Sequence, residues 1–198
     1  MDSGARVFPI ACHVDYWGSL PVDPYMDAYC TEMQRSYAQL WGAPNIYTPN
    51  MVINGREQWS FVGGNTTTLE AGLDDVMGDD VTTGVSLWVT SYPWDDPVVF
   101  DFEVVDPPPG EWELVVVPVQ RGIVREITAG ENGGQTLEHD NVALGWHSQG
   151  AETAGSASIE QVDDYVWDEV SLMALVRDLE TLEVVGATAV HLADLYEP

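Results

Sequence analysis

The stretch Tyr47-Thr48-Pro49-Asn50-Met51-Val52-Ile53-Asn54-Gly55 carries the strongest structural signal in this chain of 198 residues. It opens with a Thr-Pro pair, continues as a short apolar strand and ends in the Asn-Gly pair that favours a hairpin turn. An X-Pro bond is the only peptide bond that adopts the cis form at low cost, and Thr48–Pro49 is such a bond. The sequence therefore predicts a turn, a buried strand and a hairpin at this place.

The sequence on both sides of this stretch alternates strand and helix signals. Residues 7–14 form a short apolar run with β-branched content, which predicts a buried strand that leads into His13-Val14-Asp15-Tyr16-Trp17. Asp23-Pro24 is typical of a helix start, and Gly42 with Pro44 ends the helical spacing that follows. Thr67 and Glu70 form a capping box for a second helix. The predicted order over residues 1–80 is β-α-β-β-α.

From about residue 81 the pattern changes to short strands separated by turn residues. Seven or so strands at this spacing favour an antiparallel sandwich over residues 82–198. A Gly-, Ser- and Ala-rich stretch at 148–158 is predicted to be an exposed loop. The candidate strands are 85–92, 98–105, 112–120, 122–128, 141–146, 170–177 and 184–191.

The charge balance is extreme, with 33 Asp and Glu against six Arg and no Lys, a formal net charge of −27. This much negative charge repels phosphate backbones and anionic membrane surfaces, so nucleic acid is excluded as a partner. No run reaches transmembrane length and no signal peptide opens the chain, so we expect no membrane insertion. No ligand spacing for calcium or zinc is present, and we expect neither a metal nor another cofactor.

The two cysteines, Cys12 and Cys30, stand 18 positions apart. Cys12 falls in the first predicted strand and Cys30 on the apolar face of the first predicted helix. Buried thiols that behave as small hydrophobic side chains are the favoured interpretation. A disulfide between strand and helix is the alternative if the compartment is oxidising.

His13 and Asp15 lie two residues apart and therefore on one face of the predicted strand. One interpretation is an acid–base pair at the carboxyl edge of a sheet. The other is a histidine that is hydrogen-bonded in a structural network with Tyr16 and Trp17. We favour the structural network, because no nucleophile accompanies the pair.

A second polar segment, residues 130–142, lies between predicted strands. Glu131, His139 and Asn141 could build a site there. The same residues could instead satisfy backbone groups in a tight loop, as short Asn- and Gly-rich runs commonly do.

Three segments, HVDYW at 13–17, YTPNMVINGR at 47–56 and GENGGQTLEHDNV at 130–142, together resemble one family. It is the secreted, thioredoxin-like bacterial family catalogued as domain of unknown function 1223, and the resemblance extends over nearly the whole chain. It implies export, a cis Thr48–Pro49 bond and a Cys-x-x-Cys pair just upstream of the HVDYW strand. The candidate site residues that match by position are His13, Asp15, Tyr16, Trp17, Thr48, Pro49, Glu131, Asn132, His139 and Asn141.

This chain departs from the family pattern because it lacks the amino-terminal βα unit with both redox cysteines. The expected fold is thus an α/β thioredoxin-like domain, without that unit, at residues 1–80, followed by an antiparallel β-sandwich at 82–198. The expected function is that of an exported thioredoxin-related protein without thiol–disulfide activity. The alternative is a non-catalytic module that binds an unknown protein or small molecule through the sandwich and the acidic surface.

The missing unit also predicts self-association through the exposed strand edge at residues 7–14, where Val7, Phe8 and Ile10 would be uncovered.

Overall fold

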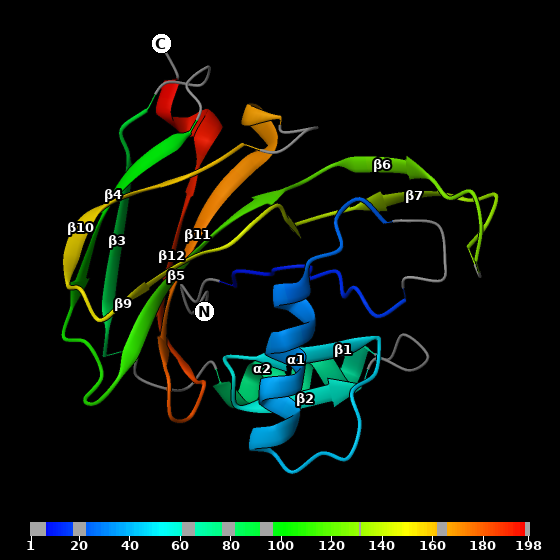
Figure 1. Ribbon diagram of the computed structural model, residues 1–198, viewed down its shortest axis with the longest axis horizontal. Helices are drawn as coiled ribbons and strands as arrows, with labels where there is room; N and C mark the ends of the chain where they lie inside the picture. The colour runs from blue at the N-terminus through cyan, green and yellow to red at the C-terminus, as the bar shows by residue number, and fades with distance from the viewer. Residues whose placement is uncertain are drawn as a thin grey trace.

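The computed structural model describes residues 7–17, 23–60, 66–76, 82–91, 97–130, 132–161 and 166–196. Strands dominate this part of the chain, and every ladder between them is antiparallel (Figure 1). Within the same residues neither helix is long and apolar enough to span a bilayer. The helical elements are α1 (Ala28–Leu40), α2 (Thr66–Val76) and two short 3-10 helices, η1 (Trp167–Glu169) and η2 (Leu192–Tyr196).

A five-stranded sheet forms the centre of the molecule, with strand order β12-β11-β5-β8 and β9 also paired with β5. Its two middle strands consist almost entirely of buried residues, since both of their faces are covered. This explains why the sequence there is a near-continuous run of Val and Leu. The strands are β5 (Trp112–Gln120), β8 (Val142–Ala143), β9 (His147–Gly150), β11 (Val170–Asp178) and β12 (Val184–His191).

A three-stranded sheet, in the order β10-β4-β3, packs on one face of the central sheet. Burial alternates along β4, so one side of this strand faces the shared core. Phe100 and Phe102 from β4 meet Leu114 and Leu172 from the central sheet in one buried cluster. The strands are β3 (Gly84–Val89), β4 (Val98–Val105) and β10 (Ala154–Ile159).

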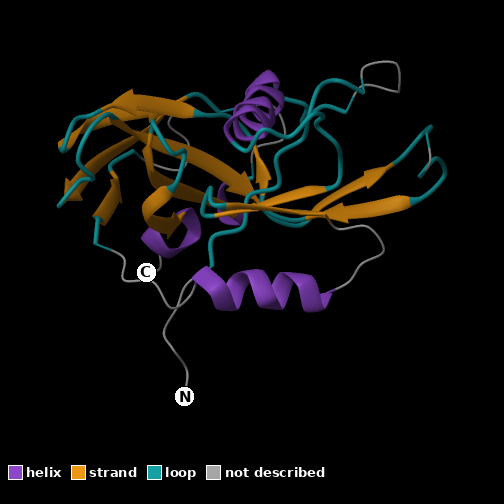
Figure 2. Ribbon diagram, turned by 90° about the horizontal axis from the view of Figure 1, so that it is seen from below, coloured by secondary structure: helices purple, strands orange, loops and turns teal. Residues whose placement is uncertain are grey.

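The opposite face of the central sheet is covered by the amino-terminal part of the chain. Phe8 and Ile10 pack there against Val115, Val117 and Val119. A hairpin of β1 (Asn50–Ile53) and β2 (Glu57–Ser60) lies beside them, with α1 and α2 on opposite sides of it (Figures 1 and 2). Helix α1 packs on this outer face, because its Tyr29 and Met33 side chains accept hydrogen bonds from Arg177 of β11.

The tip of the β1–β2 hairpin joins this part of the chain to the turn between β11 and β12. The Val184 amide donates to the Asn54 carbonyl oxygen at 2.9 Å. Gly55 has a φ of +73°, and a Cβ atom there would lie 2.0 Å from the carbonyl oxygen of Leu182. Only glycine fits this contact, which explains the Asn-Gly pair in physical terms.

A two-stranded arm of β6 (Ile123–Glu126) and β7 (Thr136–His139) continues from β5 and extends away from the central sheet (Figure 1). Its base lies close to the amino-terminal segment, because Ala11 forms an isolated bridge with Val142. The arm therefore places the polar segment 130–142 near residues 11–13 at one end and far from them at the other.

The predicted α/β thioredoxin-like class is wrong. The described residues form mostly antiparallel sheets with two α-helices, and the parallel pairings are isolated bridges, Ala11 with Val142 and His13 with Met26. The 7–14 run, predicted to be a buried strand of that domain, packs its apolar side chains on the face of the central sheet instead. An apolar run that covers a sheet face and a run within a sheet have the same composition, so composition did not separate them.

Two further predictions about elements are also wrong. The 148–158 stretch forms most of β9 and β10 rather than a loop. Glycine fits at position 155 because the residue lies opposite Phe102, where a Cβ would come within 3.0 Å of the ring. Helix α1 begins at Ala28 with Asp27 as its cap, not at Asp23, and the Asp27 side chain accepts from the Tyr29 amide at 2.8 Å.

Candidate functional site

The segment 12–17 is fixed along the first turns of helix α1 by covalent and polar contacts. Cys12 and Cys30 form a disulfide, which corrects the favoured prediction of two buried free thiols. Cys30 is 3% exposed, whereas Cys12 is exposed. One residue further along the helix, the Thr31 hydroxyl accepts from the Asp15 amide at 3.1 Å and donates to the Asp15 carboxylate. Helix α1 therefore sets the position of the whole motif.

The end of this segment meets the Thr48–Pro49 turn. The indole Nε1 of Trp17 donates to the Thr48 hydroxyl oxygen at 3.2 Å, and the Thr48–Pro49 bond is cis, as predicted. Gln34 on α1 links the two motifs a second time, because it accepts from the Tyr16 hydroxyl and donates to the Tyr47 carbonyl oxygen. We call Tyr16, Trp17, Tyr47, Thr48 and Pro49 the aromatic surface; Trp17 is 51% and Tyr47 37% exposed.

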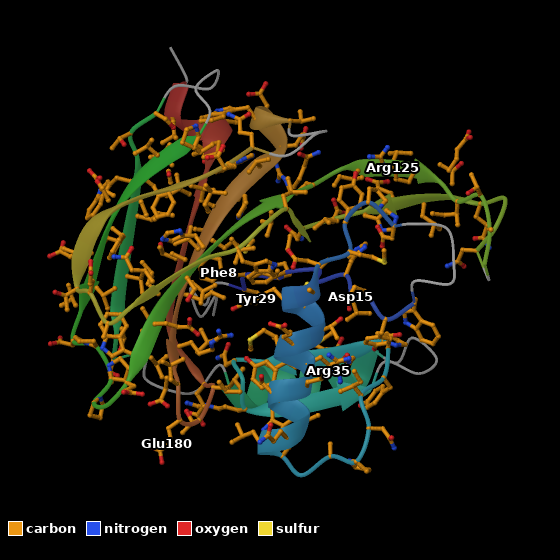
Figure 3. The ribbon with its side chains drawn as sticks, viewed as in Figure 1. Phe8, Asp15, Tyr29, Arg35, Arg125 and Glu180 are labelled. Carbon is orange, nitrogen blue, oxygen red and sulfur yellow. A yellow bond between two sulfur atoms is a disulfide. The ribbon has the colours of Figure 1, made fainter. Side chains whose placement is uncertain are left out.

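A polar cluster lies at the other end of the segment, under the β6–β7 arm. His13 Nδ1 is 2.6 Å from Asp23 Oδ2, and the His13 and His139 ring centroids are 5.6 Å apart. Arg125 on β6 donates to the Tyr25 hydroxyl at 2.7 Å and lies over the Tyr25 ring. Figure 3 shows Arg125 on the arm, with Asp15 on the segment below it. The cluster ties the arm to the segment through imidazole, phenol and guanidinium groups.

The Asp23 carboxyl is the charge-bearing acid of this cluster. Burial favours its neutral form, but hydrogen bonds from His13 and the Tyr25 amide, with the charges of His13 and His139, outweigh burial and lower its pKa from the usual value. The predicted His13–Asp15 acid–base pair is not formed, because His13 pairs with Asp23 and Asp15 with Thr31. The predicted network of His13 with Tyr16 and Trp17 is not formed either, since those two side chains bond to Gln34 and Thr48.

The third motif is only partly brought to these residues. His139 reaches His13, and the Asn141 carbonyl oxygen accepts from the Ala11 amide at 2.7 Å. Asn132 is exposed in the turn at the far end of the arm, where its carbonyl oxygen accepts from the Gln135 amide at 3.0 Å. Glu131 lies outside the described residues. The nine matched residues that the structure describes therefore do not converge on one site.

Sequence reasoning missed the residues that connect the motifs, namely Asp23, Tyr25, Gln34, Arg125 and Arg177. Arg177 on β11 is the buried one: its Nε donates to Glu113 at 2.8 Å and its Nη2 to the hydroxyl of Tyr29 on α1 at 2.9 Å. The sequence did offer one signal for the two arginines in this set. A chain of net charge −27 has only six arginines, so each of them is a candidate for a specific partner.

No group of three or more His, Cys, Asp and Glu side chains able to hold a metal ion occurs within the described ranges.

These features define a mostly antiparallel β protein in which a disulfide and polar contacts fix an exposed aromatic surface along one helix. The chain belongs to the family described as "Protein of unknown function (DUF1223)", which matches residues 1–177. This match confirms the family predicted from the three motifs. No curated protein matches the chain.

Two solved structures are similar in fold. The crystal structure of protein AGR_C_4864 from Agrobacterium tumefaciens has a TM-score of 0.62 at 16% identity, over 96% of this chain and 82% of that one. HBP35 of Porphyromonas gingivalis has a TM-score of 0.55 at 16% identity, over 86% of this chain and 60% of that one. At these identities the comparison establishes a shared fold and not a shared activity.

Proposed function

We propose that this chain is a non-catalytic binding module that acts outside the cytoplasm and recognises its partner through the aromatic surface. One observation carries the proposal: Trp17 is hydrogen-bonded to Thr48 at 3.2 Å while its side chain stays 51% exposed. A large aromatic ring in water forgoes the hydrophobic free energy that burial would give it. Tryptophan is among the residues that are enriched at binding hot spots.

The aromatic surface is held from several directions before any partner arrives. Gln34 bonds to Tyr16 and to the Tyr47 backbone, and the Cys12–Cys30 disulfide fixes the start of the segment. A side chain that is already ordered loses less conformational entropy on binding. The architecture around the Thr48–Pro49 turn thus favours recognition without a large rearrangement.

The disulfide supports both the compartment and the absence of redox turnover. Disulfides persist in oxidising compartments and are rare in the cytosol, so the Cys12–Cys30 bridge supports export. Turnover needs an accessible thiolate of low pKa beside its resolving thiol. Cys30 is 3% exposed, and the bridge anchors the segment that carries Trp17 to helix α1. A structural role for the bridge follows.

The test compares two tryptophans of equal exposure. Trp17 is 51% exposed on the aromatic surface and Trp88 is 50% exposed on β3, so Trp88→Ala is the matched control for Trp17→Ala. The wild-type chain and both variants are immobilised, and components bound from an envelope extract of the producing organism are quantified by mass spectrometry. Each recovered component is then measured in purified form by biolayer interferometry.

We expect a component that wild type and Trp88→Ala retain and that Trp17→Ala binds about 30-fold more weakly, as for a hot-spot residue. An insulin-reduction assay with the same wild-type preparation should show no turnover. Equal binding by all three proteins would overturn the aromatic surface as the binding site. Insulin turnover that Cys12→Ala abolishes would overturn the non-catalytic role.

A further inference from the structure

Arg35 on helix α1 stands apart from the other arginines that the structure describes. Arg56, Arg121 and Arg177 form ion pairs with Glu183, Glu169 and Glu113, and Arg125 bonds to the Tyr25 hydroxyl. The Arg35 side chain makes no hydrogen bond or ion pair within the described residues. In a chain with 33 carboxylates and six arginines, a guanidinium without a carboxylate partner is unexpected.

Arg35 borders a surface hollow of about 470 Å³ between the second half of α1 and the loop that follows it. Figure 3 shows Arg35 midway along this helix. The hollow combines the guanidinium with two amide side chains and an apolar part. The polar residues that line it are Arg35, Gln39 and Asn45, and the apolar ones include Ala38, Pro44 and Ile46.

The shape of this hollow is fixed by the way α1 ends. Gly42 has a φ of +64°, its amide donates to the Gln39 carbonyl at 3.2 Å, and the Ala43 amide donates to the Ala38 carbonyl at 2.8 Å. These two bonds form a Schellman motif, which satisfies the last carbonyls of the helix and sets the direction of the chain beyond it. The wall formed by residues 43–46 is therefore ordered before a ligand binds.

The hollow adjoins the aromatic surface. Ile46 lines it, and the next residue, Tyr47, belongs to the aromatic surface. Gln34, which bonds to the Tyr47 carbonyl oxygen, precedes Arg35 on α1. The two regions are thus adjacent along both the helix and the loop that follows it.

We infer that the hollow binds a single carboxylate group attached to an apolar body. The guanidinium presents five donors in a fork that matches a carboxylate, amide side chains supply further donors, and the apolar wall accepts a hydrocarbon group. The net charge of −27 disfavours polyanions, so one carboxylate is the fitting charge. This inference rests on the proposed binding role and names the chemistry of its ligand. The carboxylate comes either from a peptide carboxyl terminus or from a free organic acid.

The experiment is an NMR titration of the ¹⁵N-labelled full chain with matched acid and amide probes, up to about 10 mM because such contacts bind in the millimolar range. Hexanoate and hexanamide test a free organic acid. The dipeptides acetyl-Gly-Leu and acetyl-Gly-Leu amide test a peptide terminus. Arg35→Gln removes the guanidinium, and Arg121→Gln is the matched control at another exposed arginine, whose side chain is 49% exposed.

We expect at least one acid to shift the amide signals of residues 35–46 and its amide counterpart to bind about tenfold more weakly or not at all. Arg35→Gln should lose this discrimination, and Arg121→Gln should retain it. The tighter-binding acid identifies the source of the carboxylate. Equal binding of acids and amides, binding that Arg35→Gln leaves unchanged, or no shift with any probe would overturn the inference.

Trp17→Ala separates this inference from the proposed function, because Trp17 does not line the hollow. Hexanoate should bind Trp17→Ala as it binds wild type. If the acids discriminate as expected while no partner depends on Trp17, the proposed function fails and the carboxylate site stands. If a partner depends on Trp17 but acids and amides bind alike, only the carboxylate site fails.

Discussion

At the scale of single residues, the ion pair of Arg177 and Glu113 shows how the amino-terminal part is held on the central sheet. Their side chains are 11% and 12% exposed, and Arg177 also donates to Tyr29 at 2.9 Å and to Met33 Sδ at 2.9 Å. Burial raises the pKa of Tyr29, so its phenol stays neutral and accepts this hydrogen bond at neutral pH. One guanidinium thus joins β5, β11 and α1.

Truncation of Glu113 should be strongly destabilising. Glu113→Ala leaves the Arg177 guanidinium buried without its charge partner, and such losses cost about 3–5 kcal/mol. Urea unfolding followed by circular dichroism should show this fall in the free energy of unfolding. Glu111→Ala, an exposed position at the start of the same strand, should change it by less than about 0.5 kcal/mol. Equal effects of the two substitutions would contradict a role for the buried pair.

The Asp23 carboxyl predicts a loss of stability in acid. A carboxyl whose folded pKa is lowered contributes stability that is present above its unfolded pKa, about 3.9, and is lost as the pH falls through the folded value. Asp23→Asn should therefore destabilise the protein at neutral pH and lose less stability than wild type on acidification to about pH 3. Urea unfolding at both pH values measures the difference. A destabilisation that is the same at both values would contradict the prediction.

The contacts that sequence reasoning missed join residues that are far apart along the chain. The cis bond at Thr48–Pro49 was predicted from the family resemblance of residues 47–56, together with the low cost of the cis form at an X-Pro bond. The partner of His13 was not, because Asp23 lies 10 positions away along the chain and no local sequence preference links the two side chains. Gln34 was missed for the same reason, since it bonds to Tyr16 and Tyr47 from a different element.

At the scale of elements, sequence reasoning predicted well the strands whose residues alternate between buried and exposed or form a continuous apolar run. The structure confirms the predicted strands at 98–105 and 112–120 with the same bounds, as β4 and β5. The β9–β10 region was missed because Gly and Ala are depleted in strands by local propensity, whereas here the pairing of β9 to β5 and of β10 to β4 decides the structure. The 7–14 segment failed as a strand because its anchoring is tertiary, through Cys30 and the face of the central sheet.

The Cys12–Cys30 disulfide is the element-scale feature with the largest expected effect. It closes a loop over 18 positions, and a loop of this size contributes about 3 kcal/mol by restricting the unfolded chain. Reduction should lower the free energy of unfolding by about this amount and increase hydrogen exchange in residues 11–17 more than in β5. Urea unfolding and hydrogen-exchange mass spectrometry measure both effects. The double variant Cys12→Ser, Cys30→Ser should not respond to reductant; a response there would point to another cause.

At the scale of the whole molecule, the fold class was mispredicted because class depends on which strands pair and not on their order along the chain. A β-α-β-β-α order is compatible with a parallel sheet only if the first strand enters that sheet. Here β1 pairs with β2 alone, and residues 7–14 cover the central sheet from outside. The same local elements therefore become a covering layer on an antiparallel protein.

Self-association through residues 7–14 stays a prediction. The structure leaves Val7, at the start of this segment, as its exposed apolar contact. Val7 is 58% exposed, whereas Phe8 and Ile10 pack against the central sheet. The net charge of −27 opposes association at low salt, and the screening length falls from about 30 Å at 0.01 M to about 3 Å at 1 M salt. Sedimentation velocity should therefore show a mass that rises from the 21.8 kDa monomer toward the dimer as salt is added. Val7→Glu should remain monomeric under the same conditions, because it places a charge in the contact. A wild-type chain that stays monomeric at every salt concentration would mean that the packing of Phe8 and Ile10 already covers this surface.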